Sequence, residues 1–264
     1  MLFKTDWATH LHKIRQKEVG KIFNFFGNKN FGMGLEMGAG DGFQTSILAN
    51  KFNRFISADL NFDRIKIKLP NVDYVKCDAD DIENIFEKEQ FDMIFSSSFL
   101  EHLKDSKKFL KNSKVFLNKS GYSVHIVPSR FMKISYLLMF YPDLVVLLVD
   151  RMFNLFRKRK FFSGIGDNLA NNINVDKSEQ FVNTKRLKML FPSIHGNYKS
   201  HFEEFQKWGR GAWSELFIES GYKIISTIKG QVHSGYGFGF DRIRKILEKL
   251  GFHSTIIFIL QKND

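Results

Sequence analysis

The chain has 264 residues, of which 43% are hydrophobic and 26% charged, and its formal net charge is +12. That length and apolar content allow at least one full hydrophobic core. The single cysteine, Cys77, excludes a disulfide framework and a thiolate zinc site, and residues 1–6 form no secretory segment. We therefore expect a cytoplasmic protein, whose basic balance favours an anionic partner such as nucleic acid or an acidic membrane surface.

Taken in chain order, a leading helix is expected at about 9–26, followed by strands alternating with helices as far as strand five at 122–127. Such alternation is typical of a doubly wound, mostly parallel sheet. The alternation of strands and helices ends at Pro128. It resumes with a helix at about 201–220, strand six at 222–229, a helix at 241–250 and a last strand at 255–260. We predict one domain over 1–264, with an inserted segment at 129–200.

The most informative segment follows the first predicted strand. An apolar run closes on Glu36 and opens into glycines at positions 38, 40 and 42, and a helical stretch follows. Glycines in such a turn let the backbone approach a nucleotide-like ligand closely. Dinucleotide sites space their glycines as G-x-G-x-x-G, whereas this spacing is E-x-G-x-G-x-G. Glu36 and Asp41 would repel a pyrophosphate but suit the ammonium and sulfonium groups of S-adenosylmethionine.

Acidic residues also close the next two predicted strands. Asp59 ends the second strand, about twenty residues after the glycines, where a ribose-binding carboxylate is expected. Asp78 ends the third. This succession resembles motif I and the following elements of class I S-adenosylmethionine-dependent methyltransferases, with a seven-stranded sheet whose last strand is antiparallel. The resemblance implies cofactor contacts from Glu36, Gly38, Gly40, Gly42, Asp59, Leu60, Asp78, Ala79 and Ser96.

The segment after the fourth predicted strand, Ser96 to Leu103, resembles the type-eleven-like branch of that family. It contains neither the Asn/Asp-Pro-Pro-aromatic segment of adenine and amide methyltransferases nor the Pro-Cys nucleophile of cytosine-C5 enzymes. Cys77 is interpreted as a small core residue. No metal-ligand spacing is visible.

The inserted segment holds the longest apolar tract, Ile134 to Val149, interrupted by Pro142 and Asp143. Because a spanning helix needs about twenty apolar residues, we expect two short helices and no membrane crossing. The tract leads into Arg157-Lys158-Arg159-Lys160, a composition typical of a segment that faces anionic lipid. The interpretation that we favour over this one is a hydrophobic lid or a dimer surface over the carboxyl edge of the sheet.

The acceptor is predicted from a shorter match. Residues 191–213, which include His195, Glu204 and Trp208, resemble methyltransferases of surface-glycan assembly, and this implies that Glu204 and Trp208 line an acceptor pocket. A hydroxyl acceptor needs a base, and His102 and His195 are the candidates. We therefore expect O-methylation of a carbohydrate or lipid-linked glycan precursor, with an RNA methyltransferase or a cofactor-binding assembly protein without turnover as alternatives.

Overall fold

The computed structural model describes residues 7–65, 67–162, 192–238 and 240–263. The chain divides into two compact units: Met1–Ser135 together with Ile194–Asp264, and Tyr136–Ser193. The predicted insertion, 129–200, begins and ends slightly outside the second unit.

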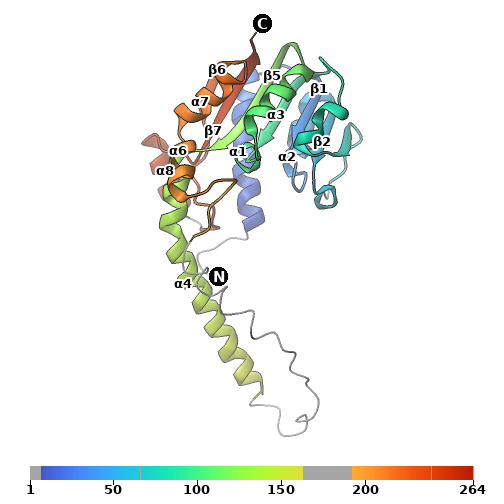
Figure 1. Cartoon of the computed structure of the whole chain (residues 1–264). Helices are drawn as coiled ribbons and strands as arrows, with labels where there is room; N and C mark the ends of the chain where they lie inside the picture. The colour runs from blue at the N-terminus through green and yellow to red at the C-terminus, as the bar shows by residue number, and fades with distance from the viewer. Residues whose placement is uncertain (1–6, 66, 163–191, 239, 264) are drawn as a thin grey trace. The chain divides into compact units, whose positions relative to one another are not determined.

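The first unit is built on a seven-stranded sheet with the strand order β3-β2-β1-β4-β5-β7-β6 (Figure 1). Only β7 runs antiparallel to its neighbours β5 and β6. The predicted doubly wound sheet with an antiparallel last strand is confirmed. Its strands are β1 Phe31–Met37, β2 Phe52–Asp59, β3 Val72–Lys76, β4 Phe91–Ser97, β5 Leu117–Pro128, β6 Tyr222–Lys229 and β7 Thr255–Lys262.

Strand β4 shows why this sheet is buried on both faces. Neighbouring side chains on a strand point to opposite faces. Ile94 belongs to one buried apolar cluster, whereas Met93 and Phe95 belong to another. The strands are therefore apolar almost throughout, as expected for a parallel sheet covered by helices on both sides.

Helices connect the strands, and several of them pack against the sheet. The helices in the described part of the chain are α1 Trp7–Phe26, α2 Phe43–Leu48, α3 Ser106–Ser113, α4 Arg130–Phe162, α6 His201–Lys207, α7 Arg210–Glu219 and α8 Asp241–Lys249. The single helix predicted at 201–220 is two helices, because Gly209 is extended at their junction. A side chain at 209 would meet the Arg130 guanidinium at 2.9 Å, so the break coincides with a close contact.

Helix α4 corrects the prediction of two short helices. It continues from Arg130 through Pro142 to Phe162, although an interior proline removes one backbone hydrogen bond and crowds the preceding turn. Residues Arg130–Val149 have a mean hydropathy of 1.7, and 11% of the apolar window is buried. This helix is long and apolar enough to cross a membrane by length and composition alone, so the expectation that the tract is too short was wrong.

Candidate functional site

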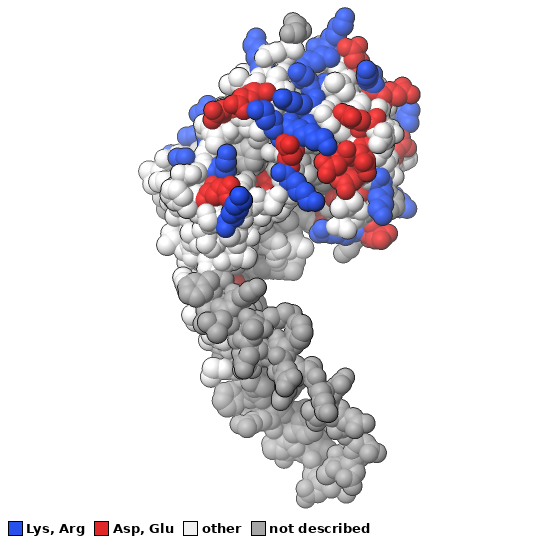
Figure 2. Space-filling view, viewed as in Figure 1, with Lys and Arg blue, Asp and Glu red and all other residues white. Residues whose placement is uncertain are grey.

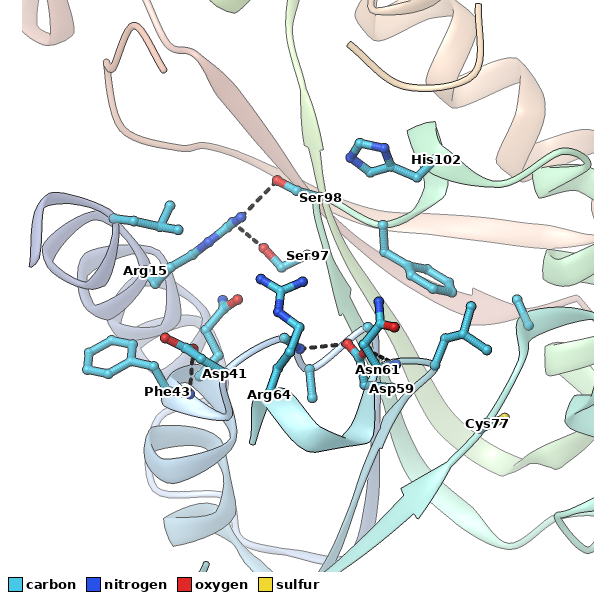
Figure 3. A pocket seen from close by; sticks show the side chains of 18 of the residues that line it. Arg15, Asp41, Phe43, Asp59, Asn61, Arg64, Cys77, Ser97, Ser98 and His102 are labelled. Carbon is cyan, nitrogen blue, oxygen red and sulfur yellow. Dashed lines mark hydrogen bonds between the residues drawn. The ribbon is translucent and has the colours of Figure 1, made fainter. Parts of the chain in front are cut away.

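A cavity of about 720 Å³ lies at the carboxyl ends of β1, β2, β3 and β4 (Figure 3). Its volume is within the usual range for small-molecule sites. Parallel strands end at one edge of a sheet, so loops that are distant in the sequence meet there. Helix α1 supplies the remaining wall.

The glycine loop forms the floor of this cavity. Gly38, Gly40 and Gly42 have φ values of 76°, 62° and 81°, in the left-handed region that other residues adopt only under strain. A Cβ atom at Gly38 would also meet the Phe99 ring at 2.6 Å. Gly38 and Gly40 line the cavity, whereas Gly42 starts helix α2.

Asp59 is fixed by two backbone donors. Its Oδ2 accepts a hydrogen bond from the N–H of Gly40 at 2.7 Å, and its Oδ1 accepts one from the N–H of Asn61 at 2.7 Å. Each carboxylate oxygen keeps a free lone pair, so both ribose hydroxyls can still be bound. Leu60 follows, is 53% exposed and lines the cavity, as an adenine contact requires.

The end of β3 also reaches the cavity. Asp78 and Ala79 both line it. Asp78 is held in place by the N–H of Asp80, which donates to its Oδ1 at 3.1 Å. The structure thus brings Asp59 and Asp78, predicted from separate strands, to one cavity.

Glu36 and Ser96 lie behind the cavity wall. Glu36 is buried and accepts a hydrogen bond from Thr45 Oγ1 at 2.5 Å, and burial raises its pKa to about 8. Ser96 is within 2.8 Å of His125 Nδ1. Ser97 and Ser98, the next residues along the chain, line the cavity instead.

Helix α1 contributes residues that the sequence analysis missed. Arg15 donates to Ser97 Oγ and, at 2.8 Å, to Ser98 Oγ (Figure 3). His12 contacts Asp41 at 2.8 Å and stacks on the Phe43 ring. The residue pattern of α1 gives no sign that this helix will form a wall of a cavity at the carboxyl edge of the sheet.

The two histidines predicted as candidate bases lie together at one side of the cavity. The rings of His102 and His195 are 4.9 Å apart between centroids, and His102 lines the cavity. Burial lowers the pKa of His102. Burial, with a smaller contribution from His102 and Lys133, lowers that of His195 to about 4. Both imidazoles are therefore neutral near pH 7 and can accept a proton or bind a cation.

Glu204 and Trp208 correct the expectation that they line an acceptor pocket. Glu204 is buried and forms an ion pair with the buried Lys133, and Trp208 is 1% exposed. Trp208 packs against the His195 ring at 5.8 Å, and Glu204 accepts a hydrogen bond from the backbone N–H of His195 at 3.4 Å. In this structure they support His195 from the core.

Comparison with known proteins gives a consistent result. Residues 35–125, which include the glycine loop and His102, match a family described as "Methyltransferase domain". No curated protein sequence matches the chain.

Among solved structures, the fold is similar to that of a protein from Listeria monocytogenes described as an S-adenosylmethionine-dependent methyltransferase. The two share 12% identity and a TM-score of 0.55, over 95% of this chain and 98% of the other. It is also similar to the N-methyltransferase NodS from Bradyrhizobium japonicum, solved with S-adenosyl-L-homocysteine (11% identity, TM-score 0.51, coverage 95% and 87%). A third similar structure is that of a Haloferax volcanii protein described as a methyltransferase, in complex with an activator protein. It shares 11% identity and a TM-score of 0.56 with this chain, over 97% of this chain and 92% of the other. The match of residues 35–125 to a methyltransferase domain, on a fold that these structures share, supports S-adenosylmethionine-dependent methyltransferase activity.

Proposed function

We propose that the protein transfers the methyl group of S-adenosylmethionine to a hydroxyl group of a carbohydrate or lipid-linked glycan acceptor. The observation that supports this is the pair of neutral imidazoles, His102 and His195, at the edge of the cofactor cavity. In Figure 3 His102 and Asp59 lie on opposite sides of the cavity. With ribose held at Asp59, His102 would lie across the cavity from the ribose, where it could contact the acceptor.

The chemistry requires such a group for this class of acceptor. Methyl transfer is an in-line displacement, and holding the acceptor atom at near-attack distance accounts for much of the acceleration. An alcohol does not ionise near pH 7, so a positioned group must receive its proton. His102, which reaches the cavity, is the better candidate base, and His195 packs behind it.

A membrane location is proposed for the acceptor because of helix α4. Within the second unit, exposed apolar side chains recur along this helix at spacings of three and four residues, and thus share one face. They are Leu138, Tyr141, Val145, Leu148 and Met152. Four consecutive basic residues at 157–160 follow. An apolar helix face followed by a basic run suits contact with the cytoplasmic face of an anionic membrane. There the protein would reach lipid-linked glycan precursors.

The net charge of +12 also fits an RNA acceptor. Figure 2, however, shows basic and acidic side chains intermixed over the visible face of the first unit, with no continuous basic stripe there. A phosphate-binding surface would concentrate one sign of charge. We therefore favour the glycan acceptor.

A transfer assay tests the proposal. The purified full chain and labelled S-adenosylmethionine are incubated with nucleotide sugars, lipid-linked glycans and bulk RNA. We expect label in a glycan acceptor, and His102→Ala to lower kcat by roughly 10² to 10⁴ while cofactor affinity is retained. Label in RNA alone would establish the nucleic-acid alternative. Cofactor binding without transfer to any acceptor would favour an assembly protein.

A further inference from the structure

Three side chains with metal-binding atoms meet beside the cofactor cavity. Glu101 and His102 end the short helical turn Leu100–His102 after β4, and His195 precedes α6. Their ligand atoms all lie within 4.8 Å of one another. Two ligand atoms on one tetrahedral Zn²⁺ ion lie about 3.4 Å apart, so side-chain movements of roughly 1–1.5 Å would close the site.

Backbone packing holds the two segments in register. The N–H of Asn197 donates to the carbonyl oxygen of Glu101 at 2.9 Å. Gly196 has a φ of 86°, and a Cβ atom there would lie 2.5 Å from that same oxygen. Only glycine permits this approach, so the loop that carries His195 is positioned directly against the turn that carries Glu101 and His102.

The carboxylate of Glu101 provides a second, independent observation. Glu101 is 3% exposed, and its Oε2 has no hydrogen-bond partner among the residues that the structure describes. A buried carboxylate without a partner is strongly unfavourable unless a proton or a cation compensates its charge. Beside it, His102 and His195 offer ring nitrogens, and no Lys or Arg forms an ion pair with Glu101 within the described ranges.

We propose that Glu101, His102 and His195 bind one divalent transition-metal cation. Two imidazoles and a carboxylate form the ligand set of catalytic zinc sites and of non-haem iron sites, which keep open positions for a further ligand. His102 lines the cavity, so a cation held by these three residues would lie at its edge. Mg²⁺ prefers oxygen ligands and is expected to bind much more weakly.

The consequence for the reaction rests on the proposed hydroxyl acceptor, whereas cation binding does not. A cation held by Glu101, His102 and His195 would bind the acceptor oxygen and lower the pKa of its O–H, whose proton would pass to solvent. The oxygen then forms a bond to the methyl carbon as the sulfur–methyl bond breaks, and that electron pair stays on sulfur. His102 and His195 would then act as ligands, and neither would be the base.

Metal binding is tested on the full chain after treatment with a chelator and dialysis. Titration with Zn²⁺ should give one ion per chain, and titration with Co²⁺ should give visible d–d absorption. Glu101→Gln, His102→Ala and His195→Ala should each weaken Zn²⁺ binding at least about tenfold. His253→Ala removes an imidazole outside the cavity and should leave binding unchanged. His102 is the most exposed of the three, so His102→Ala should disturb folding least. If Glu101→Gln fails to fold, the metal affinity of His102→Ala provides the test.

Two outcomes would overturn the proposal: no stoichiometric ion in the wild type, or an ion that is still bound with unchanged affinity in both histidine variants. Transfer assays separate this failure from failure of the proposed function. Activity on a hydroxyl acceptor that persists in metal-free protein would leave His102 as a direct base. An ion bound as expected, with no transfer to any hydroxyl acceptor, would support the site and refute the acceptor.

Discussion

At the scale of single residues, Asp59 is a position where cofactor affinity should be sensitive to substitution. Its carboxylate already accepts two backbone hydrogen bonds and has lone pairs left for a ribose. Asp59→Ala should weaken S-adenosylmethionine binding by about 1–3 kcal/mol, because it leaves ribose hydroxyls and two N–H groups without a partner. Asp59→Asn keeps one acceptor oxygen and should have an intermediate effect, measured by isothermal titration.

A matched control lies on the neighbouring strand. Asp73 on β3 pairs with Arg54, both side chains are more than half exposed, and Asp73 does not line the cavity. Asp73→Ala should therefore leave cofactor affinity unchanged. Equal affinities in the wild type and Asp59→Ala would remove Asp59 from the cofactor site.

Arg15 gives a second prediction at this scale. Its side chain is 12% exposed and lines the cavity. The guanidinium donates to Glu18 at 3.3 Å and to Ser97 and Ser98, which still leaves N–H groups able to bind a carboxylate. We predict that it binds the carboxylate of the cofactor's methionine moiety. Arg15→Met should weaken S-adenosylmethionine by about 1.5–3 kcal/mol but weaken its decarboxylated analogue far less.

The comparison of the two ligands isolates the carboxylate contact. Lys13→Met removes a neighbouring positive charge from an exposed position of α1 that does not line this cavity, and should affect neither ligand. If Arg15→Met weakens both ligands equally, Arg15 acts by holding Ser97 and Ser98 in place, and the carboxylate contact is wrong.

At the scale of elements, strand β5 carries a buried titratable group. His125 lies within 2.8 Å of Ser96 Oγ and 2.7 Å of Ser123 Oγ, and it stacks on Phe217. Burial lowers its pKa from an ordinary 6.5 to about 3. The unfolded chain therefore binds a proton below pH 6.5 that the folded chain does not, so stability is present above 6.5 and lost as the pH falls toward 3.

This predicts an acid sensitivity that one substitution removes. Between pH 6.5 and 4 the free energy of unfolding should fall by about 1.4 kcal/mol per pH unit through His125 alone. His125→Asn cannot be protonated in this range and should lose that part of the slope. Urea unfolding of both proteins at several pH values gives the difference, in which the other titrating groups cancel. Parallel curves would show that His125 is protonated in the folded state.

The bounds of some helices and strands could be predicted from the sequence, whereas those of others could not. Strand β6 was predicted at the bounds observed, Tyr222–Lys229, because Gly221 and Gly230 delimit an unbroken β-rich run. Helix α4 was predicted wrongly, because the cost of Pro142 was treated as decisive when long apolar stretches continue the helix on both sides.

The candidate site divides in the same way. Asp59 and Asp78 could be predicted, because parallel strands bring their carboxyl ends to one edge. The contribution of Arg15 and the meeting of Glu101 with His195 depend on tertiary packing between distant segments, including the approach of Gly196 to Glu101. Sequence spacing contains no signal for such contacts.

At the scale of the whole molecule, the net charge of +12 calls for a partner, and the distribution of the basic residues indicates which kind. Net charge alone would suit nucleic acid, but the intermixed charges visible in Figure 2 do not form a phosphate-binding stripe on that face. The densest basic run in the sequence, residues 157–160, instead follows the exposed apolar side chains of α4. We predict that this combination brings the enzyme to anionic membranes.

The prediction is tested by flotation with phosphatidylglycerol-containing vesicles. Replacing Arg157, Lys158, Arg159 and Lys160 by Gln should release the protein, since each cation contributes on the order of 1 kcal/mol near an anionic surface. Replacing four lysines at 104, 107, 108 and 111 changes the net charge equally and should not release it. Leu138→Ser with Val145→Ser, at positions 63% and 59% exposed, should also weaken binding if α4 inserts its apolar face. A wild-type protein that never floats with anionic vesicles would refute the membrane location and leave a lid or a dimer surface as the role of this helix.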